Sequence, residues 1–585
     1  MTSGPTDLYR NLADDLGWLE EHARTRAETA PQSASLRFAA ALVRNLVAPA
    51  STGGSASPLH LAVVGGAGTG KSTIANLLCG AVVAEANPQA GFTRHPVAYV
   101  TAARTLEWTT SDGFLGPLTR RIDATSSNLH EDVYQIRTVP AEHDATLLHR
   151  FVVWDCPDMT TWAASGYAPR LLEVAALADV IVYVASDERY NDAVPTEYLR
   201  LLLASGKPVV VVLTKMKPEN AAALTEHFRK EVLSKLPRGR VAILTVPQLT
   251  AEELANPSTA AAQYRIPLVN QIAVLGEVPD QLRRQSVQAA VNYLRNSQDE
   301  LLAVARDDVA AMEEWSKLIR SAQAEFEDRY RREFLTTAKF HRFDEALVKL
   351  IDLLEIPGAG KYVTATLYVV RTPYRLLKGF MGKMFAVPGL PAIPEQPVLE
   401  SAFSAWMDRV QATALAQAKK HDLWARVSVG FAQGVDKESQ ERFRAGLRDF
   451  QAGQTDEIDR TARAIYEDLE KSPGTLKALR GSKLALDVVA IGGSIVMGGI
   501  TAWDFVTVPL AAAISQQLVE WVGASYVDMQ REQARQRQSN LVHRFVSQPI
   551  ANWLAQWPLT GGTPYERLKQ ILERVPRTLM ELRIP

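Results

Sequence analysis

Short apolar runs alternate with amphipathic stretches along the first half of the chain. The runs are seven or eight residues long and rich in Val and Ile, and they lie at 59–65, 149–155, 179–186, 208–214 and 240–246. Stretches with helical spacing, such as 168–178 and 191–206, separate them. Parallel strands buried on both faces read as continuous apolar runs, and helices connect them. The pattern predicts a doubly wound α/β domain over 59–276.

Beyond residue 280 the pattern changes to long helical repeats with many charged positions, as in 280–334, which contains no proline. The N-terminal stretch 5–50 also predicts two helices, with a break near Pro31 and Ser33. Helices of this length usually build an extended bundle or a coiled coil. We therefore expect an α/β domain combined with an all-α part, arranged as N-terminal helices packing with the stalk at 1–58, a nucleotide domain at 59–276 and a helical stalk at 277–585.

Composition narrows the class of protein. The chain has 585 residues and a net charge of −1, which argues against an electrostatic grip on nucleic acid along its whole length. Its two cysteines, Cys79 and Cys156, both fall in the predicted α/β domain, so a disulfide framework is not expected. The first 21 residues contain no apolar run of the secretory type. We expect a cytoplasmic protein that binds no nucleic acid.

The segment 63-VVGGAGTGKST-73 has the spacing of a phosphate-binding loop, since a predicted strand precedes it and a predicted helix follows. In such loops the glycines let backbone N–H groups wrap the phosphates. Lys71 would reach the β- and γ-phosphates, and the hydroxyl of Ser72 would bind Mg²⁺. The residues expected to bind nucleotide here are Gly65, Gly66, Ala67, Gly68, Thr69, Gly70, Lys71, Ser72 and Thr73.

Two further segments suit a magnesium–nucleotide site. Asp155 ends a predicted buried strand, which is the position of the acid that supports Mg²⁺ in such proteins. Thr93 lies in a predicted loop before another strand, where a threonine completes the metal shell when a γ-phosphate is present. The predicted metal ligands are therefore Ser72, Thr93 and Asp155.

Together these motifs resemble the dynamin superfamily of large GTPases. The family's Thr-Arg-Arg-Pro appears here as 93-TRHP-96, and its Asp-Leu-Pro-Gly-Met-Thr appears as 155-DCPDMT-160. Its base-reading Thr-Lys-x-Asp appears as 214-TKMK-217, again after a buried strand. The resemblance implies binding and hydrolysis of GTP with Mg²⁺, a helical stalk that contacts or remodels membrane, and self-association as a homo-oligomer or a nucleotide-dependent dimer.

The chain departs from the family pattern at positions that matter for chemistry. Ala67 and Gly68 replace a Gln and a Ser that assist hydrolysis in the family. Asp158 replaces a glycine, and its carboxylate would repel a γ-phosphate or act on water or Mg²⁺, so we include it with Lys71 and Thr93 as candidate catalytic residues. Lys217 replaces the acid that reads guanine and has no acceptor atom.

Base selectivity therefore stays open between GTP and ATP. Thr214, Lys215 and Lys217 are the candidate base-side residues, with the stem of Lys215 able to pack on the base. Two other interpretations remain: a pseudo-GTPase scaffold with weak or no hydrolysis, and a soluble ATP-using machine.

Two segments are candidates for membrane contact. Residues 356–391 mix aromatic and basic residues with no acid, which suits an interface with anionic headgroups. A nucleic-acid patch has the same composition, and a packed amphipathic helix is the other alternative. Residues 484–527 contain an uncharged run, 488–502, too short to cross a bilayer, and then Pro509. That pattern is typical of a re-entrant hairpin or of a buried core hairpin. We expect peripheral association with membrane lipid.

Overall fold

The computed structural model of the chain describes most of its residues. They are residues 5–25, 30–51, 58–85, 94–104, 106–109, 114–122, 131–140, 147–159, 164–337, 340–354, 394–471, 474, 502–559 and 565–582. The chain divides into two compact units, one containing residues up to 307 together with those from 566 onward, and the other containing residues 308–565. The three predicted domain ranges stay predictions. The two compact units divide the chain by contacts between its elements, whereas the predicted ranges divide it where the sequence pattern changes.

Within the described residues, eight strands form one sheet in the order β3-β4-β2-β5-β1-β6-β7-β8. The strands are β1 (Leu59–Gly65), β2 (Val97–Thr101), β3 (Thr119–Arg121), β4 (Val133–Val139), β5 (Phe151–Asp155), β6 (Val180–Ser186), β7 (Val209–Thr214) and β8 (Val241–Val246). Every neighbouring pair is parallel except β2 and β5. The predicted doubly wound domain is confirmed, and β3 and β4 were missed because polar, partly exposed positions break their apolar pattern.

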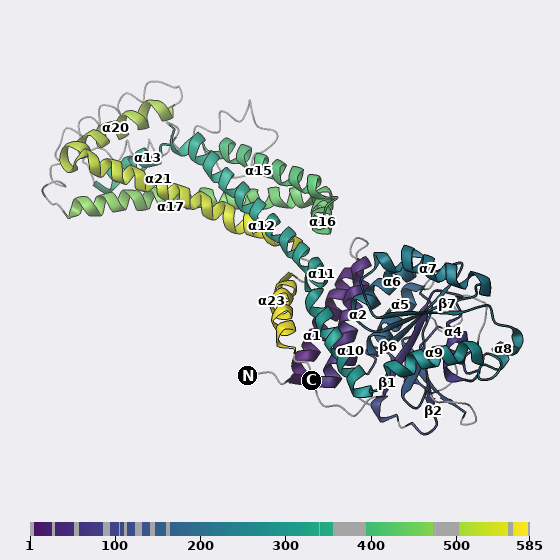
Figure 1. The fold of residues 1–585 in the computed structure, drawn as a ribbon. Coiled ribbons are helices and arrows are strands. Elements are labelled where there is room, and N and C mark those ends of the chain that lie inside the picture. The colour runs from purple at the N-terminus through teal and green to yellow at the C-terminus, as the bar shows by residue number, and fades with distance from the viewer. Residues whose placement is uncertain are drawn as a thin grey trace. The chain divides into compact units, whose positions relative to one another are not determined.

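Helices cover both faces of this sheet (Figure 1). They are α4 (Lys71–Cys79), η2 (Glu107–Thr109), α5 (Ala164–Leu177), α6 (Ala193–Ala204), η3 (Pro218–Asn220), α7 (Ala221–Glu231), η4 (Leu233–Lys235), α8 (Ala251–Ala255) and α9 (Ala262–Leu275). Strands β1, β6 and β7 are buried along their whole length, as strands covered on both faces must be. Helix α4 packs against β1 and β5, and α5 packs against β1.

The N-terminal helices belong to the same compact unit as the sheet. The elements concerned are α1 (Pro5–Arg24), α2 (Ala30–Leu42), the π-helical turn η1 (Val43–Val47), α3 (Ala48–Ser51), α10 (Pro279–Asn296), α11 (Gln298–Leu301) and α23 (Tyr565–Glu581). Helix α2 packs on α1 and on α5, and η1 packs on α10. Helix α23 is held by Arg574, which pairs with Asp15, and by Arg295, which donates to the carbonyl of Leu579 at 2.9 Å.

A buried polar cluster fastens α10 to the edge of the sheet where β1, β6 and β7 begin. Asp179 accepts a hydrogen bond from the backbone N–H of His60 at 2.8 Å and pairs with Arg283 of α10 at 2.9 Å. Lys207 is fully buried and donates to the carbonyls of Ala176, at 2.9 Å, and Ala178. Burial lowers the pKa of Lys207 to about 7, against the opposing effect of Asp179. The cluster lies at the edge opposite the predicted nucleotide loop, which follows the end of β1.

In the described residues, the second unit is a bundle of helices and short helical turns. They are α12 (Ala303–Tyr330), η5 (Arg331–Leu335), α13 (Arg342–Leu354), α15 (Gln396–Gln417), α16 (Asp422–Gly430), η8 (Phe431–Val435), α17 (Asp436–Glu470), α20 (Ala502–Val522), α21 (Ala524–Val546), η9 (Ser547–Ala551), α22 (Asn552–Gln556) and η10 (Trp557–Leu559). They share one apolar core, which encloses a buried ion pair of Arg342 with Glu395 at 3.0 Å. The predicted helical part is confirmed.

The candidate membrane segments are described only in part. Residues 356–391 lie outside the described residues, as do 484–501. Helix α20 continues through Pro509, where the sequence suggested a break, because packing of the following turns outweighs one missing backbone donor. Ala511, Ile514 and Leu518 of α20 are buried, the latter two in the bundle core. No helix in the described part of the chain is both long and apolar enough to cross a bilayer.

Candidate nucleotide site

The loop after β1 has the backbone geometry of a phosphate cradle. Gly65 lies so close to β6 that a Cβ there would stand 2.2 Å from the carbonyl oxygen of Val184, so only glycine fits. Gly70 has a φ of 90° at the N-cap of α4, in the left-handed region that favours glycine. The loop therefore turns sharply from strand to helix and leaves backbone N–H groups at the start of α4 for an anion.

Thr214 ties this loop to the end of β7. Its hydroxyl donates to the carbonyl of Thr69 at 2.6 Å, while the hydroxyl of Thr69 donates to the carbonyl of Gly66 at 2.9 Å. Thr214 is buried, so in this structure it shapes the loop. Its predicted role in binding nucleotide stays a prediction.

The ammonium group of Lys71 lies at the centre of the site. It donates to the carbonyl of Gly66 at 2.9 Å and forms an ion pair with the carboxylate of Asp158. Both side chains are less than one-tenth exposed. A carboxylate thus takes the position beside Lys71 where a phosphate oxygen is expected in a loaded loop.

Ser72 and Asp155 form the second polar pair. The hydroxyl of Ser72 donates to Asp155 Oδ2 at 2.8 Å, and the strand register places Asp155 opposite Val63 of β1 and Val97 of β2. Asp155 Oδ1 is buried and has no hydrogen-bond partner in the structure. Burial raises the pKa of Asp155 to about 6, although Lys71 and Ser72 act in the opposite direction.

This pair fits a magnesium ion. The orphaned carboxylate oxygen beside a serine hydroxyl offers hard oxygen donors, which Mg²⁺ prefers, and the ion keeps most of its shell for phosphate oxygens and water. Within the described ranges no three His, Cys, Asp or Glu residues form a metal cage of their own. Thr93, the third predicted ligand, lies outside the described residues, which resume at Arg94.

The base-side residues lie at the end of β7. Lys215 has a φ of 65°, an uncommon conformation for a residue with a side chain, and Lys217 starts the short helix η3 in an extended conformation. Both lysines are exposed, and Met216 between them is buried. The two side chains are therefore free of the core at the sheet edge where the nucleotide loop lies, but Lys217 supplies no acceptor for guanine.

The sequence reasoning missed two arginines near the site. Arg189 follows β6 and donates to the carbonyl of Ala67 at 3.4 Å. Arg170 of α5 is almost fully buried and donates to the carbonyl of Arg94 at 3.2 Å. Arg170 and Glu173 are the only charged residues in the otherwise apolar run 168–178. Charged residues in such a run are rarely buried unless they are paired, so the sequence already indicated that these two have partners.

Comparison with known proteins supports the GTPase character of the domain. The sequence profile of the 50S ribosome-binding GTPase family matches residues 60–215, which contain the phosphate loop, Asp155 and Thr214. No curated protein sequence matches the chain.

Solved structures similar to this chain include bacterial dynamins. Two come from work on an oligomerised bacterial dynamin pair that senses and tethers membranes. They have 12% and 11% sequence identity, TM-scores of 0.35 and 0.37, and each covers 90% of this chain and 89% of its own. A third, the LeoA bacterial dynamin GTPase from ETEC, has 10% identity and a TM-score of 0.24, over 98% of this chain and 97% of its own.

Proposed function

We propose that this chain, whose nucleotide domain is of the GTPase type, binds GTP with Mg²⁺ at its 65–73 loop and hydrolyses it. The observation that carries the proposal is the arrangement at the start of α4. Ser72 faces the carboxylate of Asp155, the last residue of β5, and Lys71 faces that of Asp158 in the segment after β5. The loop between β1 and α4 has the backbone of a phosphate cradle. Phosphoryl transfer needs this combination of positioning and charge compensation.

Each residue has a distinct role in this proposal. Lys71 binds the β- and γ-phosphates, while Ser72 and Asp155 hold Mg²⁺ directly or through water, with Thr93 joining them when a γ-phosphate is present. Magnesium would neutralise charge on the phosphates. The backbone N–H groups of 66–73 complete the cradle.

Asp158 has two consequences for the reaction. Its carboxylate must leave Lys71 before a phosphate can pair with that lysine, so nucleotide binding displaces the segment that carries Asp158. A displaced carboxylate near the γ-phosphate is a candidate base for the attacking water, since it needs only to come within hydrogen-bond reach. This role offsets in part the missing groups at Ala67 and Gly68.

The identity of the base is tested by Lys217→Asp. A carboxylate at this position accepts hydrogen bonds from the N1–H and N2–H groups of guanine, and adenine has no donors at these two positions. We therefore expect the ratio of GTP to ATP affinity to rise about tenfold. The measurement is equilibrium binding of fluorescent GTP and ATP analogues with Mg²⁺. Lys217→Ala is the matched control, because it removes the ammonium without adding an acceptor, and its ratio should equal that of the wild type. An unchanged ratio in Lys217→Asp would place the base elsewhere.

A second function is favoured by one observation. The carboxylate of Asp158 balances the charge of Lys71 without a bound phosphate, as a pseudo-GTPase scaffold would require. The same binding measurement separates the two, because a scaffold of this kind binds neither nucleotide in wild type or variants. Equal binding of GTP and ATP would instead support a base-tolerant or ATP-using enzyme.

We also propose that the helical part acts at a membrane surface, as a peripheral partner of anionic lipid, and that the chain self-associates. The support is the motif resemblance and the acid-free, aromatic and basic composition of 356–391.

Flotation with anionic liposomes tests this membrane proposal. The double variant Lys378→Glu with Lys383→Glu should bind the liposomes about 30-fold more weakly, since each of the two lost cations near the surface weakens binding by about 1 kcal/mol. Lys419→Glu with Lys420→Glu makes the same charge change at two exposed positions of the bundle and should float like the wild type. Failure of the wild type to float with or without nucleotide would remove the membrane claim.

A further inference from the structure

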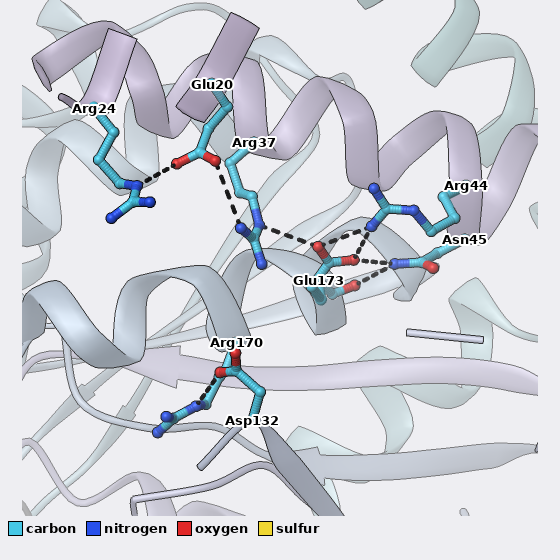
Figure 2. A network of polar contacts seen from close by, with 8 residues as sticks. All are labelled: Glu20, Arg24, Arg37, Arg44, Asn45, Asp132, Arg170 and Glu173. Carbon is cyan, nitrogen blue, oxygen red and sulfur yellow. Dashed lines mark hydrogen bonds and ion pairs between the residues drawn. The ribbon is translucent and has the colours of Figure 1, made fainter. Parts of the chain in front are cut away.

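One buried carboxylate joins the nucleotide domain to the N-terminal helices. Glu173 of α5 is fully buried and accepts hydrogen bonds from three side chains of α2 and η1 (Figure 2). Arg37 donates at 3.2 Å, Arg44 at 3.1 and 3.2 Å, and Asn45 at 2.9 Å. A buried charge is tolerated only when it is paired in this way, so the contact holds α5 in one position relative to α2 and η1.

Local backbone features are adapted to this contact. Arg44 and Asn45 both lie in the π-helical turn η1, a rare element that is frequent at functional sites, and both reach the same carboxylate. Asn45 also donates to the backbone carbonyl of Glu173 at 3.2 Å. Gly116 packs so closely that a Cβ there would lie 2.2 Å from Arg44 Nη1. The contact therefore has a defined geometry.

The same helix carries the connection to the nucleotide site. One turn before Glu173, Arg170 pairs with Asp132 at 3.0 Å and donates to the carbonyl of Arg94, the residue after Thr93. The chain that enters α5 carries Asp158, which pairs with Lys71. Helix α5 thus contacts the residue after Thr93 and the N-terminal helices, and it begins six residues after Asp158 in the chain.

We infer that Glu173 is a positioning residue that couples the state of the nucleotide site to the helix pair α1–α2. The bonds to Glu173 hold α5 where Asp158 lies on Lys71, and movement of Asp158 away from Lys71 is passed through α5 to residues 30–51. This inference rests on the proposed function for its trigger, a phosphate at Lys71. Coupling between two sites is reciprocal. A variant that weakens the hydrogen bonds to Glu173 should therefore raise nucleotide affinity, because Asp158 then leaves Lys71 more easily.

The test uses the full chain and starts without nucleotide. Asp158→Asn removes the carboxylate from Lys71 and so imitates its displacement. Hydrogen exchange of residues 30–51 is compared between Asp158→Asn and wild type, and between Asp158→Asn/Glu173→Gln and Glu173→Gln. With Glu173 present, we expect Asp158→Asn to raise the exchange rate of residues 30–51 several-fold. In the Glu173→Gln background, the same substitution should change that rate by less than a third as much. Equal changes in both comparisons, or none in the first, would overturn the inference whether or not the chain binds GTP.

Nucleotide affinity provides a second readout that a purely structural role would not move. Glu173→Gln should bind a GTP analogue about three- to tenfold more tightly than wild type. The double variant Asp158→Asn/Glu173→Gln should bind it no more tightly than Asp158→Asn alone. Glu173→Asp keeps the charge and should restore wild-type affinity. Additive effects of the two variants would contradict the coupling. Absence of binding in every variant would count against the proposed function, and the exchange comparison would still decide the coupling.

A matched control separates the tie from general loosening of the helix pair. Glu20 of α1 is also buried and faces the same Arg37 at 3.7 Å, but the ion pairs that the structure describes for it are with Arg24 and Arg37 and not with α5. Glu20→Gln should therefore keep wild-type affinity within about twofold and the full exchange response. Should Glu173→Gln fail to fold, Arg44→Gln leaves Arg37 and Asn45 on Glu173 and should halve the response or more. A full response in Arg44→Gln would then overturn the inference.

Discussion

Lys71→Ala is expected to lower the affinity for GTP by roughly 100-fold or more, about 2.7 kcal/mol. The variant removes the only ammonium group seen within the described part of the cradle, and a charge-assisted bond to phosphate is among the strongest polar contacts. It also leaves the buried carboxylate of Asp158 without its cation, so that the carboxylate repels an incoming phosphate. Equilibrium titration with a fluorescent GTP analogue and Mg²⁺ measures the change.

Lys235→Ala is the matched control for this result. Lys235 lies in the same domain, is two-thirds exposed and, among the described residues, pairs with the exposed Glu231. Surface pairs of this kind contribute little, so its affinity should equal that of the wild type. Similar affinity in Lys71→Ala and wild type would mean that the 65–73 loop does not hold the phosphates.

Asp158→Asn is expected to bind GTP about 10- to 100-fold more tightly and to hydrolyse it more slowly. In the free protein, the variant leaves Lys71 without its counter-charge, and breaking a buried pair costs about 3–5 kcal/mol before water and the carbonyl of Gly66 compensate. Bound phosphate restores that charge balance, so binding becomes more favourable. Loss of the carboxylate also removes the proposed base, and kcat should fall about 100-fold.

The two effects are separated by measuring Kd by titration and kcat by phosphate release. Asp187→Asn is the control, since Asp187 is exposed just after β6 near the same sheet edge and its change should alter neither quantity by more than about twofold. Weaker binding in Asp158→Asn would mean that the carboxylate supports the nucleotide, for example through the metal. Tighter binding with unchanged kcat would leave Asp158 as a competitor for Lys71 and exclude it as the base.

The strands that form the centre of the domain were predictable because they are buried on both faces. Their apolar runs mark β1, β5, β6 and β7 in the sequence. A similar run marks β8, although that strand lies at the edge of the sheet and is only half-buried. Strands β3 and β4 lie at one side of the sheet and carry polar positions, so an apolar run does not mark them. The phosphate loop was predictable for a similar local reason, since its glycines, Lys71 and Ser72 act within eleven consecutive residues.

The sequence by itself determined the chemistry that depends on residue type and short spacing: the glycines of the cradle, the Lys71–Ser72 pair, Asp155 at a strand end, and the absence of an acceptor at Lys217. Only the tertiary structure decided which distant groups meet. It set Asp158 on Lys71, Arg170 on the carbonyl of Arg94, and Glu173 between Arg37 and Arg44. The physical reason is that these contacts join residues between 76 and 136 positions apart. Their geometry follows from strand order and helix packing, which local spacing does not encode.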